Sequence, residues 1–391
     1  MLSTTARPVI EATLPIIADR ISSITPKFYN RLFAAHPELL DGTFSRSNQK
    51  NGTQQQALAG SIAVFATHLI KHPETTPETM LSRIAHKHTS LGVAEEQYSV
   101  VYEHLFAAIA EDLGEALTPQ IAEAWTEVYW LMAHALIKIE KGLYARQANS
   151  EVYTPWILAD RTPTGLDSVT FSFVPADATP ATVAKPGQFV SLRLAMPDGI
   201  RQVRQYTLSN DVDQIDRRTV TVKLDADGEF SPVLHHNMQI GDVVELSNPY
   251  GDLVIDDDGA PLVIATAGIG CTPSAAALQN LVARASERKI RVLHADQEFE
   301  AWPLRDQMIE SVAKLPQASI ATWFERGALP EGLNAKQGYM DLADALEEDS
   351  IVYLCGPLPF MHAVRNQALA AGIPAARIHY EVFGPDVWLA A

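Results

Sequence analysis

The chain has 391 residues, of which 47% are hydrophobic and 20% are charged. This length and composition indicate a globular protein of more than one domain and exclude a disordered chain. Its 47 acidic residues outnumber its 30 Lys and Arg residues, and the net charge of −17 makes nucleic acids and anionic membranes poor partners. Two cysteines allow at most one disulfide bond and favour a reduced, cytoplasmic protein, which we expect to be a monomer.

Residues 1 to 147 are predicted to form an all-α domain of six or more helices. Its first residues show an amphipathic pattern with Glu11 inside it and no basic start, which is typical of a helix and not of a signal peptide. Apolar residues recur at spacings of three and four, and Pro and Gly stand between the runs, as in HPETTPET and LGEALTPQ. No apolar run approaches the roughly 20 residues that span a bilayer, so we expect no integral membrane association.

One stretch of this region, RIAHKHTSLGV, carries two histidines two positions apart. Neighbours two apart on a helix point to nearly opposite sides, so one metal ion cannot use both. His86 lies on the polar side. The apolar stripe that contains His88 runs through Leu81, Ile84, His88 and Leu91. From the pattern alone, His88 is either a histidine of the core or a metal ligand.

Residues 150 to 257 are predicted to form a small antiparallel β-barrel. SVTFSFVPA and RTVTVKLDADGEF alternate apolar and polar residues, and GQFVSLRLAMPDG and GDVVELSNPYGD add further short strands. In RQYTLSN, Arg204 can hold a diphosphate, Tyr206 can stack on a flavin ring, and Thr207 can donate to a ring nitrogen. In GEFSPVLH, Gly228 and Ser231 can contact the remaining phosphate oxygens.

Residues 258 to 391 are predicted to form an α/β domain with a parallel sheet, because short apolar runs alternate with helical stretches. ATAGIGCTPSAAAL follows a strand and opens a helix, where backbone N–H groups can bind a phosphate. YLCGPLPFM repeats this design at another strand end, and two such turns can flank one crevice. The candidate nucleotide-binding residues are Gly268, Gly270, Thr272 and Pro273 in the first turn and Cys355, Gly356 and Pro357 in the second.

These motifs and the C-terminal YEVFGP, taken in order, resemble the ferredoxin–NADP reductase family over residues 150 to 391. The resemblance implies that the barrel binds FAD and that the α/β domain binds NADH or NADPH. It also implies that Phe383 packs near the flavin beside Glu381. Thr207 and Val382 depart from common patterns of this family, which leaves the tuning of the flavin open.

The helical region resembles the globin domain of the flavohaemoglobins over residues 1 to 147, through KFYNRLF, HPEL, NGTQQQAL, AHKHTSLGV and EQY. The resemblance implies that His88 is the iron ligand of a haem b. It implies that Phe44 packs against the haem and that Tyr29, Gln54 and Leu58 line the opposite, distal side.

The same resemblance pairs Tyr98 with Glu140 behind His88. A carboxylate that accepts a hydrogen bond from an imidazole N–H makes the ring more electron-donating toward iron. Enzymes that activate bound oxygen use such a push, and plain oxygen carriers do not need it. Without the resemblance, Glu140 would be a solvated helix charge.

The resemblance therefore implies a nitric oxide dioxygenase, which converts nitric oxide and O₂ to nitrate with electrons passed from NAD(P)H through FAD to haem. A flavin between the two is chemically required, because a nicotinamide gives two electrons together and haem iron takes one at a time. The alternatives are a peroxide or alkyl-hydroperoxide reductase with the same electron chain, and a sensor of oxygen or nitric oxide.

We predict that NADH is preferred over NADPH. The segment after the second strand of the α/β domain, HADQEFEAW, contains Asp296, Glu298 and Glu300, which repel the 2′-phosphate of NADPH, and it contains no Lys or Arg. Arg305 could reverse this preference if it folds back. The values of kcat/KM for the two nucleotides test the prediction, and a higher value for NADPH would contradict it.

Overall fold

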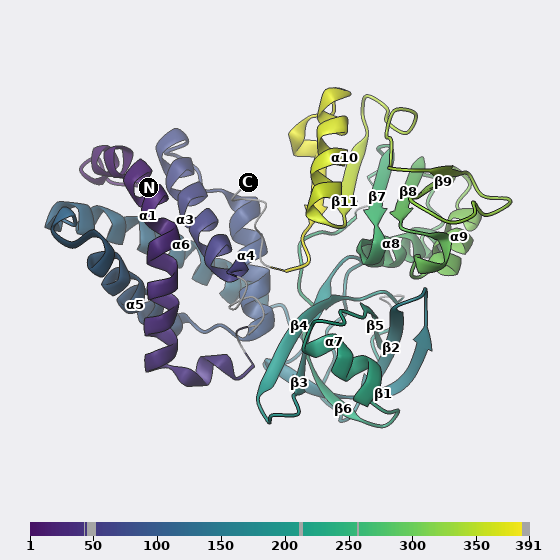
Figure 1. The fold of residues 1–391 in the computed structure, drawn as a ribbon, viewed down its shortest axis with the longest axis horizontal. Coiled ribbons are helices and arrows are strands. Elements are labelled where there is room, and N and C mark those ends of the chain that lie inside the picture. The colour runs from purple at the N-terminus through teal and green to yellow at the C-terminus, as the bar shows by residue number, and fades with distance from the viewer. Residues whose placement is uncertain (43, 45–51, 211–213, 256–257, 385–391) are drawn as a thin grey trace. The chain divides into compact units, whose positions relative to one another are not determined.

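The chain divides into two compact units in the computed structural model (Figure 1). The first consists of Met1–Val152 with Arg193–Arg204 and Gly384, and the second of Tyr153–Leu192 with Gln205–Phe383. The boundaries of the three predicted domains remain a prediction. The structure describes residues 1–42, 44, 52–210, 214–255 and 258–384.

The first unit is built on helices, as predicted. Up to residue 147, the described residues form five α-helices and two 3₁₀ turns. These are α1 (Ala6–Ala35), η1 (Pro37–Leu40), α3 (Thr53–Lys71), α4 (Glu78–Leu91), α5 (Glu95–Leu113), η2 (Gly114–Ala116) and α6 (Pro119–Tyr144). The predicted breaks fall where the helices end: Pro77 precedes α4, and Thr118 caps α6 by accepting a hydrogen bond from the Ile121 N–H at 3.3 Å.

The buried face of α4 differs from the predicted stripe. Leu81 is buried, as expected, but the buried row continues through Ala85 and Thr89, whereas Ile84 and His88 are half-buried. The apolar pattern missed Thr89 because it counts as polar. Its hydroxyl donates to the Ala85 carbonyl at 2.9 Å, so the side chain is buried without an unpaired donor.

The predicted barrel is a six-stranded antiparallel sheet with the order β4-β3-β6-β1-β2-β5. An antiparallel bridge between Leu208, directly after β4, and Val220 of β5 joins the two edges of the sheet, as barrel closure requires. The strands are β1 (Tyr153–Pro163), β2 (Ser168–Pro175), β3 (Phe189–Ala195), β4 (Arg201–Thr207), β5 (Arg218–Lys223) and β6 (Val243–Ser247), with α7 (Phe230–Pro232) and the π turn η3 (Val233–Asn237) between the last two.

The predicted α/β region contains a six-stranded parallel sheet with the order β10-β9-β8-β7-β11-β12. The chain moves outward from β7 in one direction and from β11 in the other, so a topological switch point lies between these two strands. Right-handed crossovers then place α8 and α9 on one face of the sheet and α10 on the other. The strands are β7 (Leu262–Ala267), β8 (Ile290–Asp296), β9 (Ala318–Phe324), β10 (Ala335–Gln337), β11 (Ile351–Cys355) and β12 (Ile378–Glu381). The helices and turns are η4 (Gly268–Cys271), α8 (Thr272–Ala283), η5 (Phe299–Ala301), α9 (Arg305–Lys314), α10 (Leu358–Ala370) and η6 (Ala375–Arg377).

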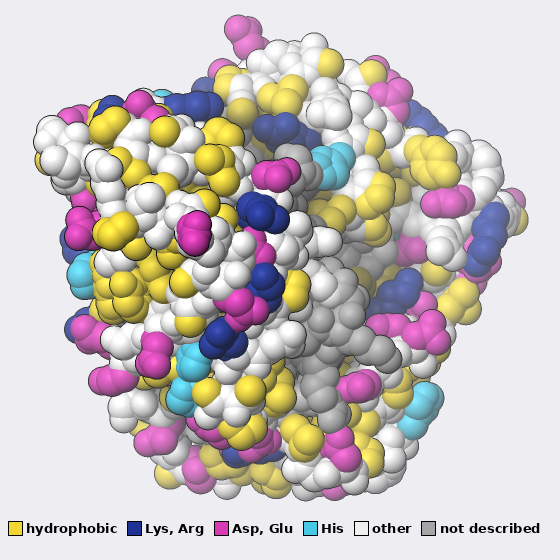
Figure 2. Space-filling view, turned by 60° about the vertical axis from the view of Figure 1, so that its left-hand side comes forward, with side chains coloured by type: hydrophobic (Ala, Val, Ile, Leu, Met, Phe, Trp, Pro, Cys, Tyr) yellow, Lys and Arg dark blue, Asp and Glu magenta, His cyan; other side chains and the backbone are white. Residues whose placement is uncertain are grey.

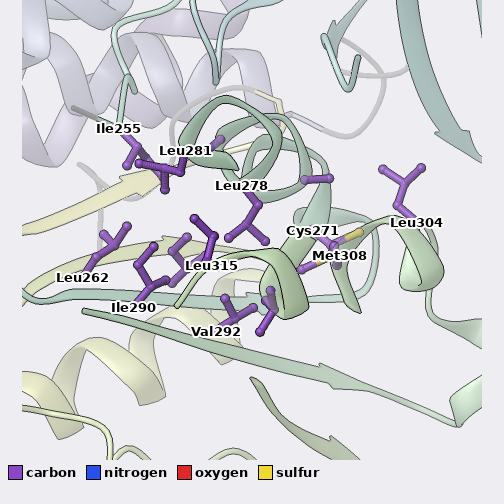
Figure 3. Packing of buried hydrophobic residues seen from close by; sticks show 14 of the residues in the cluster. Ile255, Leu262, Cys271, Leu278, Leu281, Ile290, Val292, Leu304, Met308 and Leu315 are labelled. Atoms are coloured by element: carbon purple, nitrogen blue, oxygen red, sulfur yellow. The ribbon is translucent and has the colours of Figure 1, made fainter. Parts of the chain in front are cut away.

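A buried apolar cluster fixes α8 and α9 on this sheet. Leu278 and Leu281 of α8 and Met308 of α9 pack with Leu262 and Ile290 of the central strands (Figure 3). Burying one such side chain stabilises the fold by about 1.5–3 kcal/mol. This packing positions the carboxyl ends of β7, β8 and β11.

Among the described residues, no helix has the length and hydropathy needed to cross a membrane. On the face drawn in Figure 2, Lys and Arg side chains are interspersed with Asp and Glu.

Candidate functional site

Three helices of the first unit bring His88, Tyr98 and Glu140 together. His88 lies in the last turn of α4, Tyr98 in the first turn of α5 and Glu140 near the end of α6. His88 Nδ1 lies 2.8 Å from Glu140 Oε1, and the Tyr98 hydroxyl donates to the same oxygen at 2.6 Å. Only 4% of the Glu140 side chain is exposed. The pairing expected from the sequence resemblance is therefore present as a hydrogen-bonded group.

This network sets the tautomer of His88. Burial and the neighbouring carboxylate raise the pKa of Tyr98 well above its usual value, so its hydroxyl keeps its proton and donates to Glu140. Since Glu140 is an acceptor, we assign the proton of the His88 ring to Nδ1. Nε2 then carries a lone pair, and no residue that the structure describes forms a recorded hydrogen bond with it.

A lone pair on Nε2 with the other nitrogen bonded to a carboxylate is the arrangement of a metal-ligating histidine. Within the described parts of the chain, no group of three or more His, Cys, Asp and Glu residues could hold a metal ion. A histidine with its Nδ1 bonded to a carboxylate can serve as the single protein ligand of a haem iron. Sequence reasoning missed Tyr129, whose hydroxyl donates to the Tyr98 carbonyl at 2.6 Å and braces this network.

The three residues predicted for the distal side, Tyr29, Gln54 and Leu58, lie close to Phe44, which was predicted to pack against the haem. Tyr29 on α1 is buried, and its hydroxyl is hydrogen-bonded with the side chain of Gln54 on α3. Leu58, one turn further along α3, and Phe44 pack against the same apolar cluster as Tyr29. The Phe44 ring stands edge-on to that of Tyr29, with 6.0 Å between centroids. Burial raises the pKa of Tyr29 above its usual value, so the hydroxyl is neutral and can donate.

The candidate flavin residues lie on β4 and around α7. Arg204 and Tyr206 are two positions apart on β4 and both half-buried, whereas Thr207 is buried. The Tyr206 ring lies 6.2 Å from that of Phe230 in α7. A half-buried ring beside a guanidinium fits a flavin that carries a diphosphate. Contacts from any of these residues to a flavin remain predictions.

Two other predicted flavin residues shape the turn before α7. The Gly228 N–H donates to the Asp225 carbonyl at 3.0 Å. The Ser231 hydroxyl accepts from the Asp225 N–H at 2.9 Å, so in this structure it closes the turn. Its predicted contact to a phosphate remains a prediction, as does that of Gly228.

The two predicted nucleotide turns meet at the carboxyl edge of the parallel sheet. Cys355 at the end of β11 pairs with Thr266 near the end of β7. A Cβ atom on Gly270 would lie 2.4 Å from the Cys355 carbonyl oxygen, and one on Gly356 would lie 3.1 Å from Ala267 Cβ. Both turns therefore need glycine for their close approach. They lie at the switch point of the sheet, where such folds bind nucleotides.

The remaining predicted residues of this region lie at the same edge. Thr272 begins α8, and Pro273 follows in its first turn. Pro357 is the residue directly before α10. Glu381, the last residue of β12, pairs with Cys355, and Phe383 follows with 49% of its surface exposed. Their roles toward a nucleotide or flavin remain predictions.

Comparisons with known proteins identify three consecutive regions. A globin model matches residues 26–136, an oxidoreductase FAD-binding domain model matches residues 156–255, and an oxidoreductase NAD-binding domain model matches residues 263–366. The flavohemoprotein of Bordetella parapertussis is 36% identical over 400 residues, covering 98% of this chain and 99% of that protein. That of Bacillus subtilis is 33% identical over 404 residues, covering 100% and 99%.

The chain belongs to the flavohaemoglobin family.

Solved structures agree with this assignment. A flavohemoglobin from Malassezia yamatoensis, determined with bound FAD and haem, has a TM-score of 0.93 and 44% identity over 98% of this chain and 100% of that chain. The FAD/NAD-binding domain of a nitric oxide dioxygenase from Vibrio cholerae has a TM-score of 0.55 and 30% identity over 59% of this chain and 99% of that one. The predicted organisation as a globin with an FAD- and NAD-binding reductase is confirmed.

For this flavohaemoglobin, we predict that His88→Ala abolishes stable haem binding and leaves the FAD content unchanged, because the flavin residues lie on other elements. The Soret absorbance and the flavin content of the purified variant measure this. His86→Ala is the matched control on the same helix and should keep haem. A normal Soret band in the His88 variant would show that the ligand assignment is wrong.

Proposed function

We propose that this flavohaemoglobin is a nitric oxide dioxygenase, which converts nitric oxide and O₂ to nitrate with electrons from NAD(P)H. A bound FAD would supply the means to take two electrons together from a nicotinamide and release them singly, and a haem held by His88 would supply an iron that takes one electron at a time. The hydrogen-bonded group of His88, Tyr98 and Glu140 carries this proposal.

Glu140 acts through His88. By accepting the Nδ1 proton at 2.8 Å, the buried carboxylate increases the electron-donating character of Nε2. A pure oxygen carrier gains nothing from a buried carboxylate at this place, because a neutral acceptor orients the ring as well. The Tyr98 hydroxyl shares the carboxylate oxygen and keeps it from turning away. The arrangement therefore favours an enzyme that activates oxygen.

On the opposite side, Tyr29 supplies a neutral hydroxyl in apolar surroundings. O₂ gains negative charge as it accepts electron density, and a hydrogen-bond donor stabilises that charge. The Gln54 side chain bonds to this hydroxyl and orients it. Phe28, Leu32 and Leu105 of the same buried cluster exclude water from the donor, which strengthens its interaction with charge.

Two glycines at the carboxyl edge of the parallel sheet allow the electron donor, a nicotinamide nucleotide, to bind there. Gly270 and Gly356 place no side chain at the closest approach of the turns after β7 and β11, so a pyrophosphate can approach the backbone and the N-terminus of α8. We propose that NADH binds here, with NADPH as a weaker alternative. We further propose that the protein works as a monomer in the cytoplasm, where its two free, buried cysteines stay reduced.

The electron count distinguishes the proposed reaction from its alternatives. Forming nitrate from nitric oxide and O₂ takes one electron, and each NADH gives two, so about two nitrate ions should form for each NADH consumed. A peroxide reductase would form no nitrate, and a sensor would consume NADH only slowly. The ratio of nitrate to NADH under excess nitric oxide and O₂ tests the proposal.

We predict that Tyr29→Phe lowers the rate of nitrate formation and increases the rate of O₂ dissociation by roughly ten- to a hundredfold. A hydrogen bond to a charged group contributes about 1.5–3 kcal/mol, and 1.4 kcal/mol corresponds to about tenfold. Stopped-flow O₂ release and nitrate assays measure both rates.

The matched control for this variant is Tyr102→Phe. It removes a hydroxyl on α5 that contacts Thr126 on α6. The control should keep both rates near those of the unmodified protein. If Tyr29→Phe also keeps them, Tyr29 does not stabilise bound O₂ and the distal assignment fails.

A further inference from the structure

The loops that follow β8 and β9 lie side by side at the carboxyl edge of the parallel sheet. Asp296 and Phe324 end these strands as neighbours in register. Beyond them, the Arg326 N–H donates to the Gln297 carbonyl at 2.9 Å, and the Glu325 N–H donates to the Asp296 carbonyl at 3.2 Å. This pairing brings a basic residue from the second loop to the acidic segment of the first.

The first acid of that segment, Asp296, is turned into the domain. Its side chain is 5% exposed, and Oδ1 accepts from the Gln297 N–H at 2.8 Å. Oδ2 lies 3.5 Å from Nε2 of His294, a buried ring that stacks on Trp302 with 4.6 Å between centroids. Thr266 contacts the other ring nitrogen at 2.9 Å. The sequence argument that Asp296 faces the nucleotide phosphate is therefore not supported by its orientation.

Glu298, unlike Asp296, forms an ion pair with Arg326. Glu298 Oε1 accepts from Arg326 Nη2 at 3.0 Å, and the Gln297 side-chain oxygen lies 3.2 Å from the same nitrogen. The Arg326 side chain is 64% exposed, so a ligand at this edge can reach it. Arg305, the other candidate cation, lies over the Phe299 ring at 4.0 Å and donates to the Phe299 carbonyl.

NADPH differs from NADH by a phosphate on the 2′-oxygen of the adenosine ribose. In doubly wound sheets, this ribose binds beside the carboxyl end of the second strand, where an acidic residue favours the hydroxyl and an arginine accommodates the phosphate. β8 is that strand. Arg326 has the charge and the planar donor geometry that a phosphate needs, but a carboxylate already occupies one of its donors.

We propose that Glu298 selects NADH over NADPH by holding Arg326 in an ion pair. A 2′-phosphate would have to displace this carboxylate from Arg326 before the arginine could bind it. The inference rests on the proposed binding of a nicotinamide nucleotide at this edge. It assigns the selectivity to the pair of the half-buried Glu298 and the exposed Arg326, and not to the acidic character of the whole segment.

The test uses the full-length holoprotein and measures NADH- and NADPH-dependent reduction of ferricyanide. For Glu298→Gln, the ratio of kcat/KM for NADPH to that for NADH should rise about tenfold, because Arg326 becomes available to the phosphate. Glu325→Gln is the matched control, since it removes a carboxylate beside Arg326 on the exposed edge. It should change the ratio by less than about twofold.

A double variant isolates the role of the arginine. In Glu298→Gln/Arg326→Gln, the ratio should stay within about twofold of that of Arg326→Gln alone. The proposal is overturned if Glu298→Gln leaves the ratio unchanged, if Glu325→Gln raises it equally, or if the double variant keeps the gain. Ferricyanide reduction requires no nitric oxide, so failure of the proposed dioxygenase reaction would be seen separately as absent nitrate.

Discussion

The buried carboxylate of Glu140 accepts hydrogen bonds from two other helices, through His88 Nδ1 and the Tyr98 hydroxyl. Leaving such a buried acceptor without a donor costs about 1–3 kcal/mol or more, so the network holds α4, α5 and α6 in one arrangement. The same bonds fix the tautomer of His88 and point its lone pair away from the carboxylate. One interaction thus serves both the packing of the helices and the chemistry proposed for them.

The nucleotide region depends on close approach of the backbone and not on a buried network of side chains. The pocket proposed for the haem offers the ring nitrogen of His88 and the hydroxyl of Tyr29 in apolar surroundings, whereas a dinucleotide needs close contact along a backbone. At the switch point of the parallel sheet, this contact depends on Gly270 and Gly356, where a Cβ atom would meet the neighbouring strand end. The cluster around Leu278 and Met308 keeps those strand ends in register.

Much of this architecture could be predicted from the sequence, because it depends on local patterns. Helical periodicity, strand alternation and the glycine turns each occupy a short stretch, and the order of the motifs supplied the family. The burial of Thr89 on α4 could not be predicted, because the pairing of its hydroxyl with the Ala85 carbonyl is not visible in a pattern of polar and apolar residues. The three-residue strand β10 carries too little pattern to be recognised.

Contacts between distant strands were the least predictable part of the site. Nothing in the spacing of HADQEFEAW shows that Asp296 turns toward the buried ring of His294, because Thr266, which contacts that ring, comes from another strand, and the stacking of Trp302 on it depends on the fold. Likewise, Arg326 follows the next strand and reaches the acidic segment only through strand pairing. Residue types and spacing predicted the class of site, and the fold determined which of the charged groups face a ligand.

The central claim is that Glu140 makes His88 a stronger electron donor toward iron. The most direct measurement is the iron–histidine stretching frequency in the resonance Raman spectrum of the reduced holoprotein, compared with that of Glu140→Gln. The amide keeps a hydrogen-bond acceptor of the same size but removes the negative charge. We expect a lower frequency in the variant, with haem still bound. An unchanged frequency would contradict it, because the carboxylate would then only orient the ring.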